Sequence, residues 1–199
     1  QANQPPTVNA GADTTITLPA TASFTATATD ADGSIAAWQW TKISGGPATL
    51  NGATTATLTA SGLSAGTYVF QVRVTDNQGA TAADQVTLTV NAANVAPAVN
   101  AGLDRTITLP TSSIMITGTA TDSDGTIASV QWSKTSGPAG ASLTGQTTNT
   151  VTVSNLVAGS YVFTFRATDN LGASASDTMT LTVQPAGGTG GVGAAGDLD

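Results

Sequence analysis

The sequence repeats itself with an offset of about ninety residues, and this duplication is the strongest constraint on its fold. The segment VNAGADTTITLP from Val8 aligns with VNAGLDRTITLP from Val99, and LSAGTYVF from Leu63 aligns with LVAGSYVF from Leu156. The offset grows along the chain, so the two copies differ by single-residue insertions. Two copies of this length predict two small, similar domains. We therefore expect a first domain at 1–91, a second at 92–184 and a Gly-rich flexible tail or linker at 185–199.

Apolar and polar residues alternate along most of each copy, which is typical of half-buried β-strands. Between Tyr68 and Val74, for example, every second residue is large and apolar. Turn residues such as Asp32-Gly33 separate these runs, and no stretch has helical spacing. The pattern predicts an all-β fold with two tandem immunoglobulin-like Greek-key β-sandwiches of about seven strands each. The strands expected in the first copy are two consecutive strands over 7–18, followed by 22–29, 35–42, 56–61, 68–75 and 81–90.

Two aromatic positions in each copy suit this fold. Trp40 and Trp132 lie on the third predicted strand and should fill the core between the sheets. Tyr68 and Tyr161 begin the next-to-last strand, which is the position of a tyrosine corner. We expect Trp38 to be buried beside Trp40.

The composition excludes several kinds of chemistry. There is no Cys and no His, and all twelve acidic residues are Asp, so disulfides, thiolate nucleophiles and imidazole bases are absent. A net charge of −7 with five basic residues argues against nucleic acid or anionic lipid as a partner. No apolar run approaches ~18 residues, so we expect no membrane insertion. Paired Asp residues can hydrolyse glycosides, but with no deep cleft expected we predict that the protein is not an enzyme.

The sequence resembles the PKD (polycystic kidney disease) family of immunoglobulin-like domains. The resemblance rests on NQPPTVNAG from Asn3, TDADGSIAAWQWTKISGGP from Thr29 and AGTYVFQVRVTDNQGATAAD from Ala65. The Ser-Gly-Pro sequence after the Trp strand is similar to the W-x-x-x-S-G-P subclass. The resemblance implies an extracellular module, often found in tandem in bacterial and other surface proteins and secreted enzymes. Such modules are usually non-catalytic spacers or adhesive segments, and some bind calcium.

Several oxygen-bearing side chains should meet at one end of each sandwich. The loop after the second strand and the loop before the last strand share the end at which the first strand begins. Carboxylates gathered there would repel one another by several kcal/mol unless a cation lies between them, and hard oxygen ligands suit Ca²⁺. The resemblance implies calcium at the same positions. The predicted structural Ca²⁺ ligands are Asn3, Gln4, Asp30, Asp32 and Asp76 in the first copy, and Asn94, Val95, Asp122, Asp124 and Asp169 in the second, with Gln4 and Val95 contributing backbone carbonyls.

A plain structural interpretation of the same motifs remains open. Asp-x-Asp-Gly is an ordinary turn sequence in which Asp bonds its own backbone and Gly supplies a positive φ. Three other charged residues occur at equivalent positions in both copies, and we expect each of them to have a structural role. Asp13 and Asp104 should cap a bulge in the first strand, Asp84 and Asp177 should pair with arginine or lysine, and Lys42 and Lys134 should protect a sheet edge.

These observations predict a non-catalytic extracellular tandem module, secreted or at the cell surface, that acts as a spacer, stalk or adhesin segment. Calcium at the second site would tie Asn94 to its domain and stiffen the pair. The expected partners are neighbouring domains of the same polypeptide or other surface protein chains, with polysaccharide as a further candidate. Two alternatives remain. One is a subunit of a self-assembling extracellular fibre, and the other is a carbohydrate-binding accessory module of a polysaccharide-degrading enzyme, although aromatic residues make up only 5% of the chain.

Overall fold

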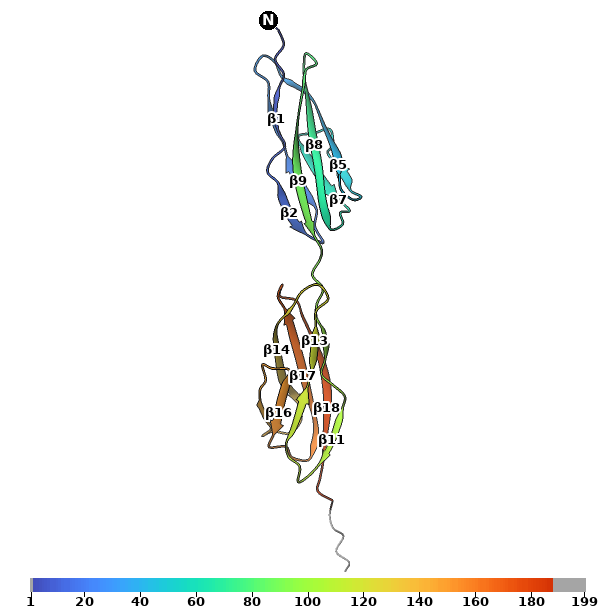
Figure 1. Ribbon diagram of the computed structural model, residues 1–199, viewed down its shortest axis with the longest axis vertical. Coiled ribbons are helices and arrows are strands. Elements are labelled where there is room, and N and C mark those ends of the chain that lie inside the picture. The colour runs from blue at the N-terminus through green and yellow to red at the C-terminus, as the bar shows by residue number, and fades with distance from the viewer. Residues whose placement is uncertain (1, 188–199) are drawn as a thin grey trace, which may run out of the picture. The chain divides into compact units, whose positions relative to one another are not determined.

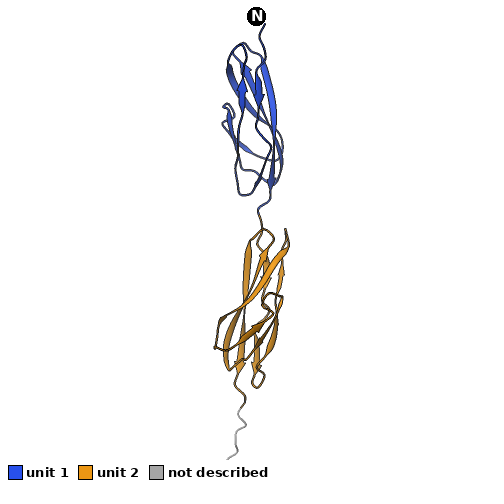
Figure 2. Ribbon diagram, turned by 90° about the vertical axis from the view of Figure 1, so that its left-hand side faces the viewer, with its two compact units in different colours: residues 1–93 blue, residues 94–199 orange. Residues whose placement is uncertain are grey.

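The computed structural model describes residues 2–187, and these residues form β-strands joined by turns (Figure 1). The chain divides into two compact units, residues 1–93 and 94–199 (Figure 2), which we call the first and second repeats. The division falls between Ala93 and Asn94, whereas the sequence analysis placed it after Asn91. Most of the predicted tail, from residue 188 onward, lies outside the described residues. No helix in the described part of the chain is long and apolar enough to cross a membrane.

The first repeat is a sandwich of two sheets. A four-stranded sheet has the order β2-β9-β8-β5, a three-stranded sheet has the order β3-β7-β6, and β1 pairs with β4. All pairs are antiparallel except β2 and β9, which run parallel. The strands are β1 (Thr7–Asn9), β2 (Thr14–Thr17), β3 (Ala22–Thr25), β4 (Thr27–Thr29), β5 (Ile35–Ser44), β6 (Thr49–Asn51), β7 (Thr57–Ser61), β8 (Gly66–Asp76) and β9 (Thr81–Asn91).

The second repeat has the same topology. Its sheets have the orders β11-β18-β17-β14 and β12-β16-β15, and β10 pairs with β13. The predicted all-β fold of two tandem sandwiches is therefore confirmed. The strands are β10 (Ala98–Asn100), β11 (Arg105–Thr108), β12 (Ile114–Thr117), β13 (Thr119–Thr121), β14 (Ile127–Ser136), β15 (Ser142–Thr144), β16 (Thr150–Ser154), β17 (Gly159–Asp169) and β18 (Ser174–Gln184).

The predicted pair of strands over 7–18 is confirmed as β1 and β2, and the chain changes pairing partners between them. β1 pairs with β4, and β2 then pairs with β9. At this crossover the Asp84 carboxylate accepts a hydrogen bond from the amide of Ala10 (2.8 Å), and the Asp13 carboxylate accepts one from the amide of Thr87 (2.8 Å). Asp84 therefore bonds the backbone rather than the arginine or lysine that was expected, and Arg73 instead donates to the Thr81 hydroxyl.

The second repeat makes the same two bonds at its crossover. The Asp177 carboxylate accepts from the amide of Ala101 (2.9 Å), and the Asp104 carboxylate accepts from the amide of Thr180 (2.7 Å). Two aspartates thus satisfy backbone donors that the sheet ladders leave free at the partner change.

The core predictions for Trp40, Trp132 and the two tyrosines are confirmed, whereas Trp38 is half-buried at the margin of the first core. Trp40 and Trp132 are buried, and each indole N–H donates to a backbone carbonyl at 3.2 Å, that of Thr55 or Asn149. The Tyr68 hydroxyl accepts from the amide of Ser64 (3.0 Å), and Tyr161 repeats this with Val157 (3.0 Å), which is the geometry of a tyrosine corner.

The two lysines lie on the edge strands β5 and β14, as expected, and each also bonds the turn that follows its strand. Lys42 donates to the carbonyls of Gly45 and Gly46 in the turn that follows β5. Lys134 does the same with Gly137 (3.3 Å) and Pro138 (2.6 Å). Each lysine therefore holds the turn after its strand, Ser44-Gly45-Gly46-Pro47 in the first repeat and Ser136-Gly137-Pro138 in the second.

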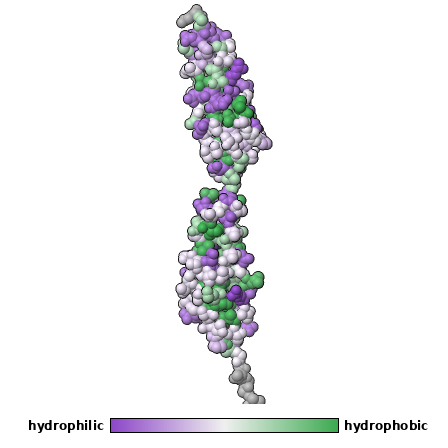
Figure 3. Space-filling model, in the orientation of Figure 1, coloured by the Kyte–Doolittle hydropathy of each residue, from purple (hydrophilic) through white to green (hydrophobic). Residues whose placement is uncertain are grey.

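The surface is built largely from residues of intermediate hydropathy, as the pale areas of Figure 3 show. Charged residues make up only 9% of the chain. The large apolar side chains that are exposed include Leu103, Met115 and Leu171. On the face shown, apolar areas are small and separate.

Candidate functional site

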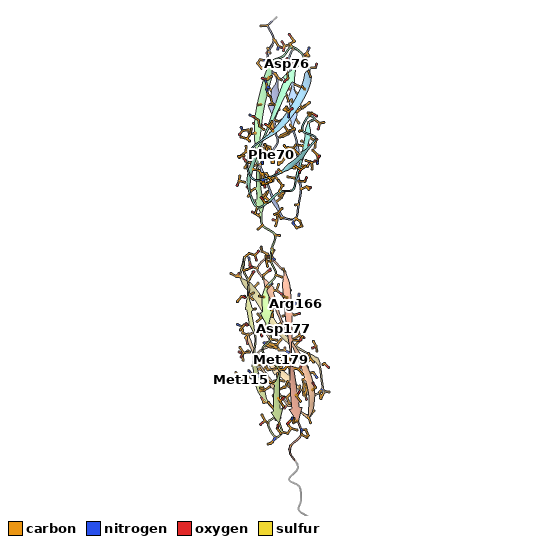
Figure 4. All side chains as sticks on the ribbon, turned by 90° about the vertical axis from the view of Figure 1, so that its right-hand side faces the viewer. Phe70, Asp76, Met115, Arg166, Asp177 and Met179 are labelled. Atoms are coloured by element: carbon orange, nitrogen blue, oxygen red, sulfur yellow. The ribbon has the colours of Figure 1, made fainter. Side chains whose placement is uncertain are left out.

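The N-terminal pole of each repeat is formed where two turns and the incoming chain meet. In the first repeat the turns join β4 to β5 and β8 to β9, and Ile35 pairs with Asp76, so both turns lie at the same end. The amide of Asn77 donates to the Ser34 carbonyl (2.9 Å), and the Asn77 side-chain oxygen accepts from the Ser34 amide (2.9 Å). Figure 4 shows Asp76 near this end and Phe70 nearer the middle of the repeat.

Asp76 is the most buried acidic group of the first pole, with 2% of its surface exposed. One carboxylate oxygen accepts from the amides of Gln78 (2.8 Å) and Ala80 (3.0 Å), and the other accepts from the side-chain amide of Asn3 (3.0 Å). Burial would raise the pKa of Asp76, but these hydrogen bonds together outweigh it and hold the pKa below its ordinary value. Asp76 is therefore a fully bonded anion that fixes the turn and the incoming chain.

Asp169 repeats this arrangement in the second repeat. It is 2% exposed and accepts from the amides of Leu171 (2.9 Å) and Ala173 (2.9 Å) and from the side chain of Asn94 (2.8 Å). The same balance lowers its pKa, because burial is outweighed by the hydrogen bonds from Asn94 and the turn amides. Both poles thus bring together the predicted Asn and the predicted Asp.

Asp30 differs from Asp76 because nothing bonds to it. Both of its carboxylate oxygens are buried without a hydrogen-bond partner, as is the side-chain oxygen of Asn3. A Cβ atom built on Gly33 would lie 2.6 Å from an Asp30 carboxylate oxygen and 2.2 Å from the Asn77 side-chain oxygen. These two oxygens therefore converge on the space above Gly33.

Gly33 is a glycine because of this crowding. Its φ is not positive, so the expectation that Gly supplies a positive φ in the Asp-x-Asp-Gly turn was wrong. Gly125 repeats the crowding, with the Asp122 carboxylate at 2.6 Å and the Asn170 side-chain oxygen at 2.3 Å from the position of its Cβ. Any larger residue at either position would displace an oxygen of the pole.

The remaining predicted residues contribute in another way than expected. Both carboxylate oxygens of Asp32 accept from the Gln4 amide (3.3 and 3.2 Å), and Asp124 accepts from the Val95 amide (3.0 Å). Gln4 and Val95 are present at their poles, but the contact that the structure shows is through N–H rather than through the carbonyl.

The carboxylates of a pole do not form one compact cluster. Within residues 2–187, no three acidic side chains lie together in a way that could hold a metal ion by themselves. The free oxygens of each pole come from one carboxylate and one amide, Asp30 with Asn3 or Asp122 with Asn94. Any cation there would need these oxygens together with a reoriented neighbour or water.

The two poles differ at this free carboxylate. One oxygen of Asp122 accepts a long hydrogen bond from the amide of Asp124 (3.4 Å), so only the other oxygen is buried without a partner. In the first pole both oxygens of Asp30 lack partners. The first pole therefore has the larger unmet demand for positive charge or hydrogen-bond donors.

Asn77 and Asn170 also belong to the poles, although neither was predicted as a site residue. Both follow the last Asp of a long strand in the motif Thr-Asp-Asn-x-Gly, which occurs once in each repeat. That repetition was the available signal. Their side chains bond the opposite turn, at Ser34 and Thr126, a contact that only the folded pairing reveals.

The donor set suits a hard cation. A buried carboxylate without a partner is costly unless a cation or a donor satisfies it, and carboxylate and amide oxygens are the ligands that Ca²⁺ accepts. The oxygens of Asp30 and Asn3, and those of Asp122 and Asn94, meet this requirement.

Known proteins resemble the chain in both sequence and fold. The family model described as "K319L-like, PKD domain" matches residues 10–90 and 101–183. The rat Dyslexia-associated protein KIAA0319 homolog is 34% identical over 185 residues, which is 90% of this chain and 17% of the relative. The mouse Dyslexia-associated protein KIAA0319-like protein is 32% identical over 186 residues, 90% of this chain and 18% of the relative. The chain thus spans less than a fifth of the length of these curated relatives.

Among solved structures, the mouse cadherin-23 fragment EC22-24 matches with a TM-score of 0.56. The match covers 92% of this chain and 67% of that chain at 17% sequence identity. At this identity the likeness concerns the fold alone, and it agrees with an arrangement of consecutive β-sandwiches.

Proposed function

Because the chain belongs to the K319L-like PKD domain family, we propose that it is a non-catalytic extracellular module that serves a longer protein as a spacer, stalk or adhesive segment. The composition supports this role, since a chain without His, Cys or Glu has few groups for catalysis. Its partners would be neighbouring domains of the same polypeptide or other protein chains.

We further propose that each N-terminal pole holds a structural calcium ion. The observation that supports this is the set of buried oxygens without partners, those of Asp30 and Asn3 in the first pole and of Asp122 and Asn94 in the second. Asp32 and Asp76 would supply negative charge from the same pole, as Asp124 and Asp169 would in the second. An ion would satisfy oxygens that the protein alone leaves unbonded.

Calcium at the second pole would also affect the connection between the repeats. The last strand of the first repeat ends at Asn91, and Asn94 and Val95 already bond to the second pole. An ion held by Asn94 would further restrict these linker residues, so we expect the pair to be stiffer in calcium than in chelator.

Calorimetric titration of chelator-treated protein with Ca²⁺ tests the site. We expect binding heat and a higher melting temperature, and loss of one site from each of the variants Asp30→Ala and Asp122→Ala. Asp84→Ala is the matched control, because that carboxylate serves the Ala10 amide away from the pole. A calcium titration of the unmodified protein without heat and without a melting shift would refute the calcium proposal.

Small-angle X-ray scattering tests the stiffening separately. The spread of end-to-end distances should narrow on addition of calcium to the unmodified protein and should not narrow for Asp122→Ala. Identical scattering in calcium and in chelator, in protein shown by calorimetry to be loaded, would contradict the stiffening while leaving the site intact.

A further inference from the structure

The second repeat contains a hollow of about 380 Å³ beside the edge strand β14. It is lined by Ala120 of β13, by residues 127–130 of β14 and by residues 147–149 of the segment before β16. Its volume lies within the range of ~300–1,000 Å³ that is usual for ligand sites. No residue of its lining is charged, and the lining does not overlap the N-terminal pole residues described above.

The first repeat shows which side chain fits at this place. Val130 is the counterpart of Trp38, since Trp38 pairs with Val74 and Val130 pairs with Ala167 in equivalent registers. Both members of this cross-strand pair are smaller in the second repeat. Val130 lines the hollow, which therefore lies beside the position where the second repeat has valine in place of an indole ring.

The neighbours of Trp38 confirm this correspondence. Ala28, Ile35 and Trp38 are half-buried and pack against the first core. Their counterparts Ala120 and Val130 pack against the second core, but Ile127 is not among the side chains that do so. Ile127 is half-buried like Ile35, and its side chain lines the hollow.

The lining combines an apolar side with a polar side. Ala120, Ile127 and Val130 offer aliphatic surface, whereas Thr148 and Asn149 offer hydroxyl and amide groups. An indole has the matching character, because it is a large apolar ring with a single N–H donor. A charged group would find no partner there and would lose hydration on entry.

We propose that this hollow is a docking site for a tryptophan side chain presented by a partner protein segment. In the first repeat Trp38 packs against the core from the equivalent strand position, whereas the second repeat has a hollow there that an outside residue could enter. Tryptophan is a common anchor at protein interfaces, because it buries a large area in a small pocket. This inference does not depend on calcium at the poles.

Titration of the chain with N-acetyl-tryptophanamide, followed by amide NMR, tests the proposal. We expect chemical-shift changes at residues 127–130 and 147–149, and none at residues 35–38. Val130→Trp should weaken this binding roughly tenfold or more, because its own indole would occupy the hollow. Trp38→Val should create a second binding site in the first repeat.

N-acetyl-leucinamide and methyl glucoside serve as comparison probes, and melting temperatures show that each variant is folded. Three outcomes would overturn the proposal. They are no shift changes in the unmodified protein, equal binding to folded Val130→Trp, and stronger binding of either comparison probe than of the tryptophan amide. The last outcome would identify the hollow as a site for another chemical class.

Discussion

The cores of the two repeats are packed differently, whereas the most buried aspartate of each pole is held in the same way. In the first core the Phe24 ring from β3 lies 6.4 Å from the Trp40 ring. In the second core Ile116 takes the place of Phe24, and Phe165 from β17 lies 4.7 Å from Trp132 instead. The aromatic ring has moved from one sheet to the other, so the core requires a filled volume rather than a particular residue at each position.

A third position completes this exchange. Ala26 of the first repeat corresponds to Gly118 of the second, where a Cβ atom would lie 2.5 Å from the Phe165 ring. The ring in the second repeat therefore occupies the space that a methyl group fills in the first.

The poles show no comparable freedom. Asp76 and Asp169 each accept from one Asn side chain and two turn amides, with matching distances. Directional hydrogen bonds to a buried anion admit few alternative residue sets, whereas dispersion contacts in a core admit many. The choice of residue at the poles is therefore limited by hydrogen-bond geometry, whereas the choice in the cores is limited by the volume to be filled.

Removal of the Phe165 ring should have the largest effect. Phe165→Ala leaves a cavity against Trp132 and is expected to lower the free energy of unfolding of the second repeat by about 4 kcal/mol. Hydrogen-exchange mass spectrometry can measure each repeat separately. The combined change Phe24→Ile, Val72→Phe and Ala26→Gly should restore part of the stability that Phe24→Ile alone removes from the first repeat. No restoration would contradict the idea of a ring exchanged between the sheets.

The methyl-for-ring exchange should have the next largest effect. Gly118→Ala pushes a methyl group against the Phe165 ring and is expected to destabilise the second repeat by about 1–3 kcal/mol. Urea unfolding of the variant provides the measurement. Combination with Phe165→Val is the control, since it should relieve most of the cost of the added methyl group. A neutral Gly118→Ala would show that the ring moves aside freely.

A smaller effect is expected at the free carboxylates. In chelator, Asp30→Asn removes a buried charge and adds donors to a pole that lacks them, so it should stabilise the first repeat by about 1 kcal/mol. Asp122→Asn should gain less, because Asp122 already has one bond. Thermal melts in chelator compare the two variants. An equal gain in stability would show that the unbonded carboxylate oxygens cost the two poles the same.

Acid is expected to have the smallest effect, and it should affect the stability of both repeats alike. The folded-state pKa values of Asp76 and Asp169 are lowered from 3.8, so their stabilisation is fully present above the unfolded-state value of about 3.8. It is lost as the pH falls through the lower folded-state values. Both repeats should therefore lose stability over the same acidic range, as hydrogen exchange between pH 2 and 5 can measure. Replacement by Asn at either position should reduce the dependence in that repeat alone.

The sequence predicted much of this molecule because its strands alternate regularly. The alternation from Tyr68 to Val74 predicted β8, and the duplication predicted the second repeat from the first. The division of the predicted strand 22–29 into β3 and β4 was missed, because it arises from a change of pairing partner. The short strand Thr49–Asn51 was also missed, since three residues are too few for a period to be recognised.

At the pole, the topology predicted which residues meet but not how they bond. Asn3 and Asp76 were placed together correctly and form a hydrogen bond. The crowding at Gly33 and the bond of Asn77 depend on ångström-scale distances between two turns, which a linear pattern does not contain. For the same reason Asp84 was expected to pair with an arginine or lysine side chain, although its carboxylate accepts a hydrogen bond from the Ala10 amide.

The parallel pairing of β2 with β9 bears on how a repeat would respond to tension. β2 lies near the start of the first repeat and β9 ends it, and they pair in register from Thr14 with Leu88 to Thr17 with Asn91. Force applied to the two ends of the repeat would shear these strands past each other. The hydrogen bonds between them would then be loaded together rather than broken one at a time. In the first repeat the parallel pair of β2 and β9 would thus resist extension by shear. The parallel pair of β11 and β18 would do the same in the second repeat.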